Sequence, residues 1–498
     1  MRLVVGKFIR PEMMRATYRP GWRKIAEFFL IGIVTTVAIA VTIRYRLSQN
    51  TLPVAVAALI FLALVAPDAR VAMRDVWIRA GRSWLGKLAC ILATWMLLSS
   101  FWAPDPHRSF TRSLTISLLI AIAITCSGAL RTVRKAQIFP WLVIATVVAI
   151  TFAVFNLLTS GIARTLINCC REGMQPDKTG SAIAIALTAW PAAGWLVLTG
   201  RKAAAALLVA LAAALVFSSN SGASGIAIVA ALVTVALGSF HKRAAVLLPL
   251  LIVLSGFATA LTLGKLDNSL LSFNVGERLA AFHANERIQI WAYYTDFFWQ
   301  RPWTGFGFNA EHTLGNPVLY KHYTPTIPPH FANLHTHNVE LQVLLEFGVV
   351  GAVLVILTMC AGVARYWNDT RPEIVFFMAA LSALAGATLV NFGLWEEWLL
   401  GVIAMTAILS VRLLQPDLPL NISEKPDSAA NSCRSPQRQR PFSPWMGDGP
   451  MLSTRPMTPV PPICSSCSNY RASFPGTAHR KAALAHGIGR ALCFRSSC

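Results

Sequence analysis

The chain has 498 residues, of which 55% are hydrophobic and only 13% are charged, and its formal net charge is +22. A soluble protein carries roughly 25% charged residues, so this composition argues against a soluble protein and predicts one embedded in a membrane. An excess of Lys and Arg is typical of the cytoplasmic loops of such a protein. The sequence has no basic patch interleaved with aromatic residues, so nucleic acid is not expected as a partner.

Twelve apolar segments follow one another along the chain. Each is close to the ~20 residues that cross a bilayer core as a helix, which predicts an all-α, polytopic integral membrane protein with about 12 transmembrane helices. The predicted spans are residues 25–43, 52–66, 84–101, 114–130, 138–159, 180–199, 203–217, 224–239, 244–263, 347–364, 374–391 and 398–414. The ninth and tenth are separated by one large loop.

The distribution of positive charge predicts the orientation. With the N-terminus inside, the short cytoplasmic segments hold 20 Lys and Arg, and the short outer segments hold 7. Lys and Arg accumulate on the cytoplasmic side. The expected organisation is a basic cytoplasmic N-terminus (1–24), nine spans (25–263), a periplasmic loop with amphipathic helices (264–346), three spans (347–414) and a proline-rich, disordered cytoplasmic tail (415–498).

The large loop contains the stretch "ERIQIWAYYTDFFWQ" (286–300). At helical spacing, Arg287 and Trp291 share one face with Tyr294 and Phe298. Taken alone, this pattern favours an amphipathic helix at the membrane interface whose arginine reaches the lipid headgroups.

A glycine-rich turn, "RPWTGFGFN" (301–309), comes next. Pro302 is expected to end the preceding helix, and Gly305 and Gly307 permit tight backbone geometry. Glycine-rich turns can offer amide donors to phosphate, so both glycines are candidates for substrate binding.

The loop ends with "HTHNVELQVLLEFGVVG" (335–351), in which two histidines precede an apolar run. On a helix, His337 would share a stripe with Leu341 and Leu344, so its imidazole is expected to point toward the packed side. A lone histidine there is most often a satisfied core residue. However, two outer helices each place one ionisable group on an apolar face, and such groups near a membrane are functional candidates.

A metal site is the competing interpretation of the same stretch. His335, His337 and Glu340 form an H-x-H-x2-E set, but histidines two residues apart on a helix diverge by about 200°. Both would reach one ion only if residue 335 preceded the helix. We therefore expect neither a bound metal nor another cofactor.

Together, these motifs resemble those of the membrane-embedded O-antigen ligase and polymerase superfamily, which builds bacterial surface polysaccharide. The family pattern is an arginine-led amphipathic helix, then P-x2-G-x-G, then His-Asn, nine residues and G-x-x-G. The matching residues are Arg287, Trp291, Pro302, Gly305, Gly307, His337, Asn338, Gly348 and Gly351. The stretch "LSSFWAPDPHRSFTRS" (98–113) is similar to the family's first outer loop, so the resemblance covers roughly residues 25–414.

The resemblance implies a metal-independent glycosyltransferase of the bacterial inner membrane with its active site on the periplasmic side. The implied partners are an undecaprenyl-pyrophosphate-linked glycan donor, a lipid A-core or glycan acceptor, and membrane lipids. His337 is the implied general base, and Arg287 would hold the leaving pyrophosphate. Asn338, Trp291 and the two glycines are the implied substrate contacts.

The chain departs from the family pattern at a second arginine, which is often part of a Ser-Arg pair at the outer end of a central helix. The corresponding stretch, "SSNSGAS" (218–224), has no arginine and separates two short spans, either thin helices or a broken pair. Arg164, Arg171 or Lys178 could replace it in substrate binding. The alternative functions are a polymerase of the same superfamily and, less favoured, a lipid-linked oligosaccharide flippase or transporter.

Overall fold

The computed structural model describes seven stretches of the chain, and all the secondary structure in them is helical. The described residues are 20–43, 47–159, 178–219, 221–263, 284–315, 335–390 and 393–417. They belong to one compact unit, Met1–Asn421. The prediction of an all-α fold is confirmed for this part of the chain, and most of the predicted tail lies outside it.

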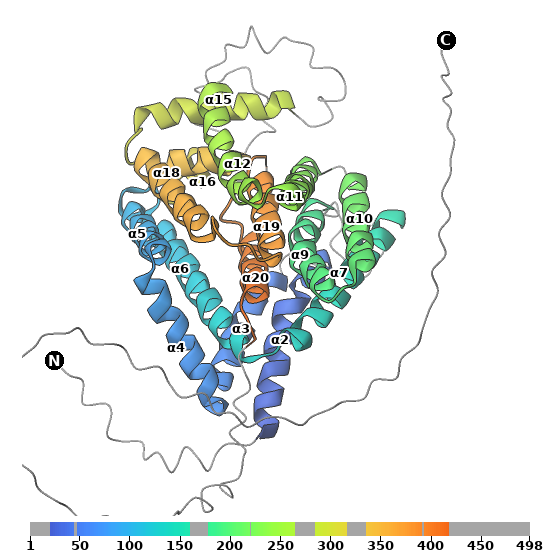
Figure 1. Ribbon diagram of the computed structural model, residues 1–498. Helices are drawn as coiled ribbons and strands as arrows, with labels where there is room; N and C mark the ends of the chain where they lie inside the picture. The colour runs from blue at the N-terminus through green and yellow to red at the C-terminus, as the bar shows by residue number, and fades with distance from the viewer. Residues whose placement is uncertain are drawn as a thin grey trace, which may run out of the picture. The chain divides into compact units, whose positions relative to one another are not determined.

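A helix is present at each of the twelve predicted spans (Figure 1). The helices are α2 (Pro20–Ile43), α3 (Leu47–Val65), α4 (Pro67–Arg82), α5 (Trp84–Ser99), α6 (Pro106–Ala129), α7 (Lys135–Leu158), α9 (Lys178–Leu198), α10 (Lys202–Ser218), α11 (Gly222–Phe240), α12 (Lys242–Leu263), α15 (Ala284–Gln300), α16 (Glu311–Leu314), α18 (Val339–Tyr366), α19 (Glu373–Thr388) and α20 (Glu397–Leu414). α4 lies between the second and third predicted spans, and α15 and α16 lie between the ninth and tenth.

The number of membrane crossings stays a prediction. Among the described residues, seven helices are long and apolar enough to cross a membrane, or eight if one bent pair counts as a single span. Three further apolar helices, α10, α19 and the main part of α20, are shorter. The helical content is therefore that of a membrane protein, whereas the count of twelve rests on the sequence pattern.

The connection between the second and third predicted spans is itself a helix, α4. Pro67 occupies the first turn, where a proline costs no hydrogen bond. Asp68 in the first turn and Arg79 and Arg82 in the last turn match the helix dipole. These charges therefore stabilise the helix, which is bent by 120° from the end of α3.

The last described part of the large loop continues into α18, which begins at Val339, before the predicted start at 347. Asn338 is its N-cap, and its Oδ1 accepts a hydrogen bond of 2.7 Å from the Leu341 amide. Gly348 interrupts the helix with φ 64° and ψ −165°. The predicted span therefore corresponds to the second half of a broken helix.

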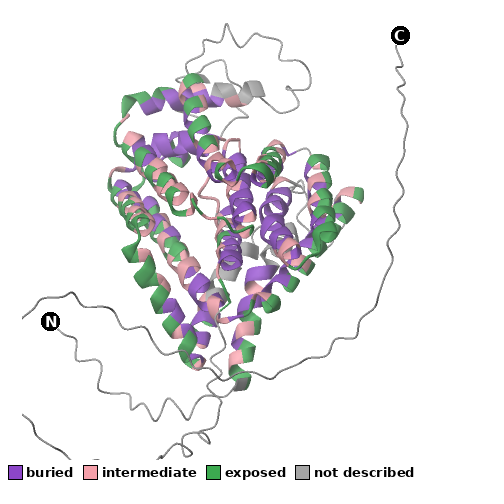
Figure 2. Ribbon diagram, in the orientation of Figure 1, coloured by how far each residue is buried: buried purple, intermediate pink, exposed green. Residues whose placement is uncertain are grey.

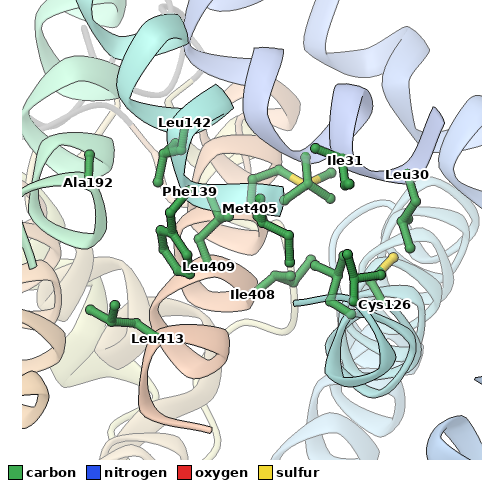
Figure 3. Packing of buried hydrophobic residues seen from close by; sticks show 14 of the residues in the cluster. Leu30, Ile31, Cys126, Phe139, Leu142, Ala192, Met405, Ile408, Leu409 and Leu413 are labelled. Atoms are coloured by element: carbon green, nitrogen blue, oxygen red, sulfur yellow. The ribbon is translucent and has the colours of Figure 1, made fainter. Parts of the chain in front are cut away.

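A core of buried apolar side chains joins early and late helices of this unit. Leu30 of α2, Phe139 of α7 and Leu409 of α20 are fully buried in it (Figure 3). α9 lies inside the bundle, because 83% of its apolar stretch is buried. These contacts hold α20, whose first residues border the candidate site described below.

Several helices have exposed faces (Figure 2), and these faces carry large apolar side chains. Leu114 of α6, Trp141 of α7 and Leu207 of α10 are exposed by 54%, 51% and 61%. Large exposed apolar surface marks an interaction with lipid or another protein. Together with the long apolar helices, it indicates that lipid surrounds this bundle.

A fully buried arginine fixes the end of α20. The Arg412 side chain donates hydrogen bonds to the carbonyl oxygens of Leu130 at 2.9 Å, Val133 at 2.7 Å and Gln415 at 3.1 Å. It also pairs with the Asp417 carboxylate. Because these contacts reach the segment between α6 and α7, they hold α20 to the neighbouring helices.

Candidate active site

α15 presents the apolar face that the sequence predicted. Trp291, Tyr294 and Phe298 are 7%, 0% and 2% exposed, and Arg287 lies one turn before Trp291 at intermediate exposure. The Trp291 indole Nε1 donates a hydrogen bond of 2.9 Å to the Thr336 carbonyl. The buried face of α15 is therefore fixed to the residues that precede α18.

His337 lies in an extended turn before α18, not on the helix. The prediction that it shares a helical stripe with Leu341 was wrong, because Asn338 is the N-cap and the helix begins only at Val339. His337 has φ 49°, a left-handed conformation that is uncommon for a residue other than glycine. The imidazole is thus positioned by a strained turn and its contacts rather than by helical periodicity.

His337 lies within electrostatic range of Arg287, the other predicted catalytic residue. Burial lowers the pKa of His337 to about 4, and the charges of Arg287 and His335 act in the same direction. Glu311 acts in the opposite direction. At neutral pH the imidazole is therefore uncharged and can accept a proton, while a guanidinium lies nearby.

His335, two residues earlier, is placed between two carboxylates. Its Nδ1 is 3.9 Å from Glu311 Oε2, and its Nε2 is 3.9 Å from Glu396 Oε1. The neighbouring Glu311 carboxylate raises the pKa of His335 from its ordinary value, and the charge of Glu396 acts in the same direction. The ring centroids of the two histidines are 6.4 Å apart, yet their pKa values are shifted in opposite directions.

The glycine-rich turn packs against the break in α18. The amides of Phe306 and Gly307 donate hydrogen bonds of 2.8 and 2.9 Å to the carbonyls of Leu345 and Glu346. On the other side of the break, the Val349 amide donates to the Pro302 carbonyl at 2.8 Å. The turn therefore satisfies backbone groups that the broken helix leaves without partners.

Both glycines of this turn are required by its geometry. Gly305 has φ 65° and Gly307 has φ 95°, and an added Cβ would overlap the backbone of Glu346 and Ala103, respectively. The Gly305 amide donates to the Arg301 carbonyl at 3.0 Å, and that of Gly307 is used as described above. These amides have backbone acceptors, so the turn supports the site through α18, and a role of the two glycines in phosphate binding stays a prediction.

The remaining predicted substrate contacts have different outcomes. Asn338 uses its Oδ1 for the cap, and its Nδ2 is buried without a hydrogen-bond partner among the described residues. Arg164 and Arg171 lie outside the described residues. Lys178 begins α9, but its side chain also lies outside them. The replacement for the second arginine therefore stays a prediction.

Glu340 is not brought to the histidines. Its Oε1 accepts a hydrogen bond of 3.2 Å from Thr388 Oγ1, and its carboxyl carbon packs beside Gly256. The structure thus separates the proposed H-x-H-x2-E metal set. Among the described residues, no group of three His, Cys, Asp or Glu side chains could hold a metal ion.

Sequence interpretation missed a polar network beside His335. Glu346 is fully buried, and its carboxylate accepts hydrogen bonds from Trp395 Nε1 at 2.7 Å and Gln342 Nε2 at 3.2 Å. Arg112 of α6 donates to the Trp395 carbonyl at 2.7 Å. A polar cavity of about 20 Å³, room for one water molecule, lies among Arg112, Asn309, Glu311, His312, His335, Gln342, Gly393, Trp395 and Glu396.

One signal in the sequence could have found part of this network. Glu340, Gln342 and Glu346 interrupt an otherwise apolar run, "VELQVLLEF" (339–347). Buried carboxylates are rare without partners, so partners from other elements were to be expected. No pattern in the sequence identifies those partners, because Thr388, Leu394 and Trp395 come from distant segments.

A larger, apolar cavity of about 530 Å³ lies among α6, α12, α18, α19 and α20. Its lining residues run along α20 from Trp395 to Val411. Trp395 also borders the polar cavity, so the two cavities meet at this side chain. The arrangement can hold an apolar chain whose polar end lies beside His335.

Comparison with known proteins supports the resemblance seen in the motifs. A family model described as O-antigen ligase matches residues 206–356, which include α15, the glycine-rich turn and the first half of α18. A protein of Rickettsia felis that carries the name of a polysaccharide ligase is 21% identical over 342 residues, covering 67% of this chain and 81% of the relative. Both matches support the predicted resemblance to the O-antigen ligase superfamily.

Proposed function

We propose that this chain, which resembles the O-antigen ligase superfamily, transfers a glycan from an undecaprenyl-pyrophosphate carrier to a sugar hydroxyl of lipid A-core or another glycan. The observation that carries this proposal is the proximity of a neutral His337 and the Arg287 guanidinium. One group can accept a proton while the other stabilises negative charge on phosphate.

In the proposed step, His337 removes the proton of the acceptor hydroxyl. The hydroxyl oxygen forms a bond to the anomeric carbon of the donor glycan, and the bond from that carbon to the pyrophosphate oxygen breaks. The proton moves to the imidazole, and the electron pair leaves with the pyrophosphate. General base catalysis of this kind contributes roughly 10²–10⁴-fold.

Arg287 is proposed to bind the leaving pyrophosphate. A guanidinium can donate two parallel hydrogen bonds to phosphate oxygens, which an ammonium cannot. Arg287 also contributes to the low pKa of His337. When anionic donor offsets the charge of Arg287, that pKa should rise toward neutrality, so the base becomes stronger once its substrate is bound.

The apolar cavity is proposed to hold the lipid part of a substrate. It extends along α20 away from the site, and its volume of about 530 Å³ lies within the range of ~300–1,000 Å³ for small-molecule sites. A lipid chain in it would leave the polar headgroup beside Trp395 and His335. Neither a metal nor another cofactor takes part in the proposed step.

The orientation remains part of the proposal. The charge split of 20 against 7 Lys and Arg supports an active site on the periplasmic side of the bacterial inner membrane. Reporter fusions after residues 175 and 320 should then lie outside, and fusions after 135 and 420 inside. A cytoplasmic reporter at 320 would contradict both the orientation and the reaction.

The proposed reaction is tested by His337→Ala. Transfer should fall by ~10²–10⁴-fold, with normal amounts of protein in the membrane. The accumulating lipid-linked species distinguishes the two enzymes of the superfamily: long polymer indicates a ligase, and single repeat units indicate a polymerase. Unchanged transfer in His337→Ala would overturn the proposal.

A further inference from the structure

A residue outside the proposed catalytic pair holds the turn that carries His337. Glu311 is 4% exposed, and its Oε1 accepts a hydrogen bond from the Thr336 amide. Its Oε2 faces His335 Nδ1 at 3.9 Å. One buried carboxylate therefore contacts both residues that directly precede His337.

We propose that Glu311 is a positioning residue that fixes the conformation and the charge environment of His337. The inference rests on the proposed function, in which His337 is the base. Glu311 itself does not touch the reacting atoms. Its role is to help hold the backbone of residues 335 to 338 in the observed conformation.

The backbone of this turn needs such support. A left-handed residue other than glycine costs about 1–3 kcal/mol and persists only where its surroundings over-determine it. Here three hydrogen bonds hold Thr336. Its amide donates to Glu311, and its carbonyl accepts from Trp291. Its hydroxyl donates to the Asn338 carbonyl at 3.0 Å. Removing Glu311 leaves a buried amide without an acceptor, so the φ of 49° at His337 loses one of its restraints.

The charge of Glu311 acts on the same imidazole. The groups that face His337 are Arg287 from α15, His335 from its own turn and Glu311 from the segment around α16, and among these only Glu311 raises its pKa. His335 in turn faces Glu311, Glu396 and Arg112. Loss of the Glu311 charge should therefore lower the pKa of His337 further, whereas loss of the Glu396 charge acts on His335.

Three variants of the full chain in purified, lipid-reconstituted form test this role. Glu311→Gln keeps an oxygen that can accept from the Thr336 amide but loses the charge. Glu311→Ala loses both. Glu396→Gln is the matched control, because it makes the same chemical change on the other side of His335 without contact to Thr336.

The positioning role predicts a separation of effects. At neutral pH, kcat should stay near the wild-type value in Glu311→Gln and fall by ~10–10²-fold in Glu311→Ala, the effect of a misplaced catalytic group. KM for the donor should not change, since Arg287 is untouched. The acid limb of kcat/KM should move to lower pH in Glu311→Gln, because its His337 is protonated less readily, and should not move in Glu396→Gln.

Several results would overturn the inference. These are a wild-type kcat in Glu311→Ala, an equal fall of kcat in Glu311→Gln and Glu311→Ala, or an acid limb that moves equally in Glu311→Gln and Glu396→Gln. If Glu311→Ala does not fold, the test rests on the acid limb of kcat/KM alone, compared between Glu311→Gln and Glu396→Gln. A silent His337→Ala would instead contradict the proposed function, so the two failures are distinguishable.

Discussion

The end of α20 and the start of α18 contain buried polar groups of opposite character. Near the last turn of α20, Arg412 is 0% exposed and is surrounded by carbonyl and carboxylate oxygens that accept its hydrogen bonds. At the start of α18, Asn338 Nδ2 and Glu340 Oε2 are buried without a hydrogen-bond partner among the described residues. His337, in the same region, has a left-handed backbone.

This difference separates a structural cluster from a functional one. A buried charge with a full set of partners stabilises one arrangement of helices. Strained backbone and incompletely paired polar groups persist where substrate or mechanism requires them. On this ground we assign the start of α18 to the proposed catalytic centre and the end of α20 to the scaffold.

The largest expected effect is on transfer in Arg287 variants. Arg287→Ala should lower the transfer rate by ~10²–10³-fold, the usual cost of losing a donor to developing negative charge. Arg287→Lys should lose nearly as much, because a compact ammonium cannot form the two-pronged contact with phosphate. Full activity of the lysine variant in a single-turnover assay would reduce Arg287 to an interfacial anchor.

A substitution at the end of α20 should lower the stability of the protein rather than its activity. Arg412→Ala removes one donor from each of the buried carbonyls of Leu130 and Val133, and an unsatisfied buried carbonyl costs roughly 1–3 kcal/mol. The Tm of the detergent-solubilised protein should fall, while transfer per folded molecule and its pH profile stay unchanged. A changed pH profile in this variant would contradict the distinction between the end of α20 and the start of α18.

A smaller effect is expected at the break in α18. Gly348→Ala places a Cβ against the Trp303 carbonyl at a φ of 64°, which costs about 1–3 kcal/mol in backbone strain. Gly362 lies in the same helix with nothing within 4 Å of an added Cβ, so Gly362→Ala is the matched control and should be neutral or stabilising by about 0.5–1 kcal/mol. Equal Tm values for the two variants would contradict the packing of the glycine-rich turn on α18.

The sequence predicted this fold where its pattern is periodic. Long apolar runs identified a helix at every expected span, and the stripe of Trp291, Tyr294 and Phe298 predicted the buried face of α15. α4 could not be identified in this way, because its charged residues interrupt the apolar pattern. The position of His337 was misjudged for a local reason, since an Asn cap outweighs the continuation of a helical stripe.

The candidate site was predictable only in its residues that belong to a motif. Arg287 and His337 could be paired because the family pattern names both. Glu311 could not, because its role depends on a contact with Thr336 across 25 positions of sequence. Tertiary partners of buried polar groups are decided by packing, which no local pattern encodes.

The central claim is that Arg287 and His337 act as one unit, and the pH dependence of kcat/KM tests it most directly. In the wild type, burial, Arg287 and His335 lower the pKa of His337 to about 4, and the acid limb of kcat/KM reports that group in the free enzyme. Removing the positive charge in Arg287→Ala should raise this pKa, so the acid limb should move to higher pH. Arg287→Lys keeps the charge and should leave the limb in place while lowering the plateau. An acid limb that does not move in Arg287→Ala, or that persists in His337→Ala, would contradict the account.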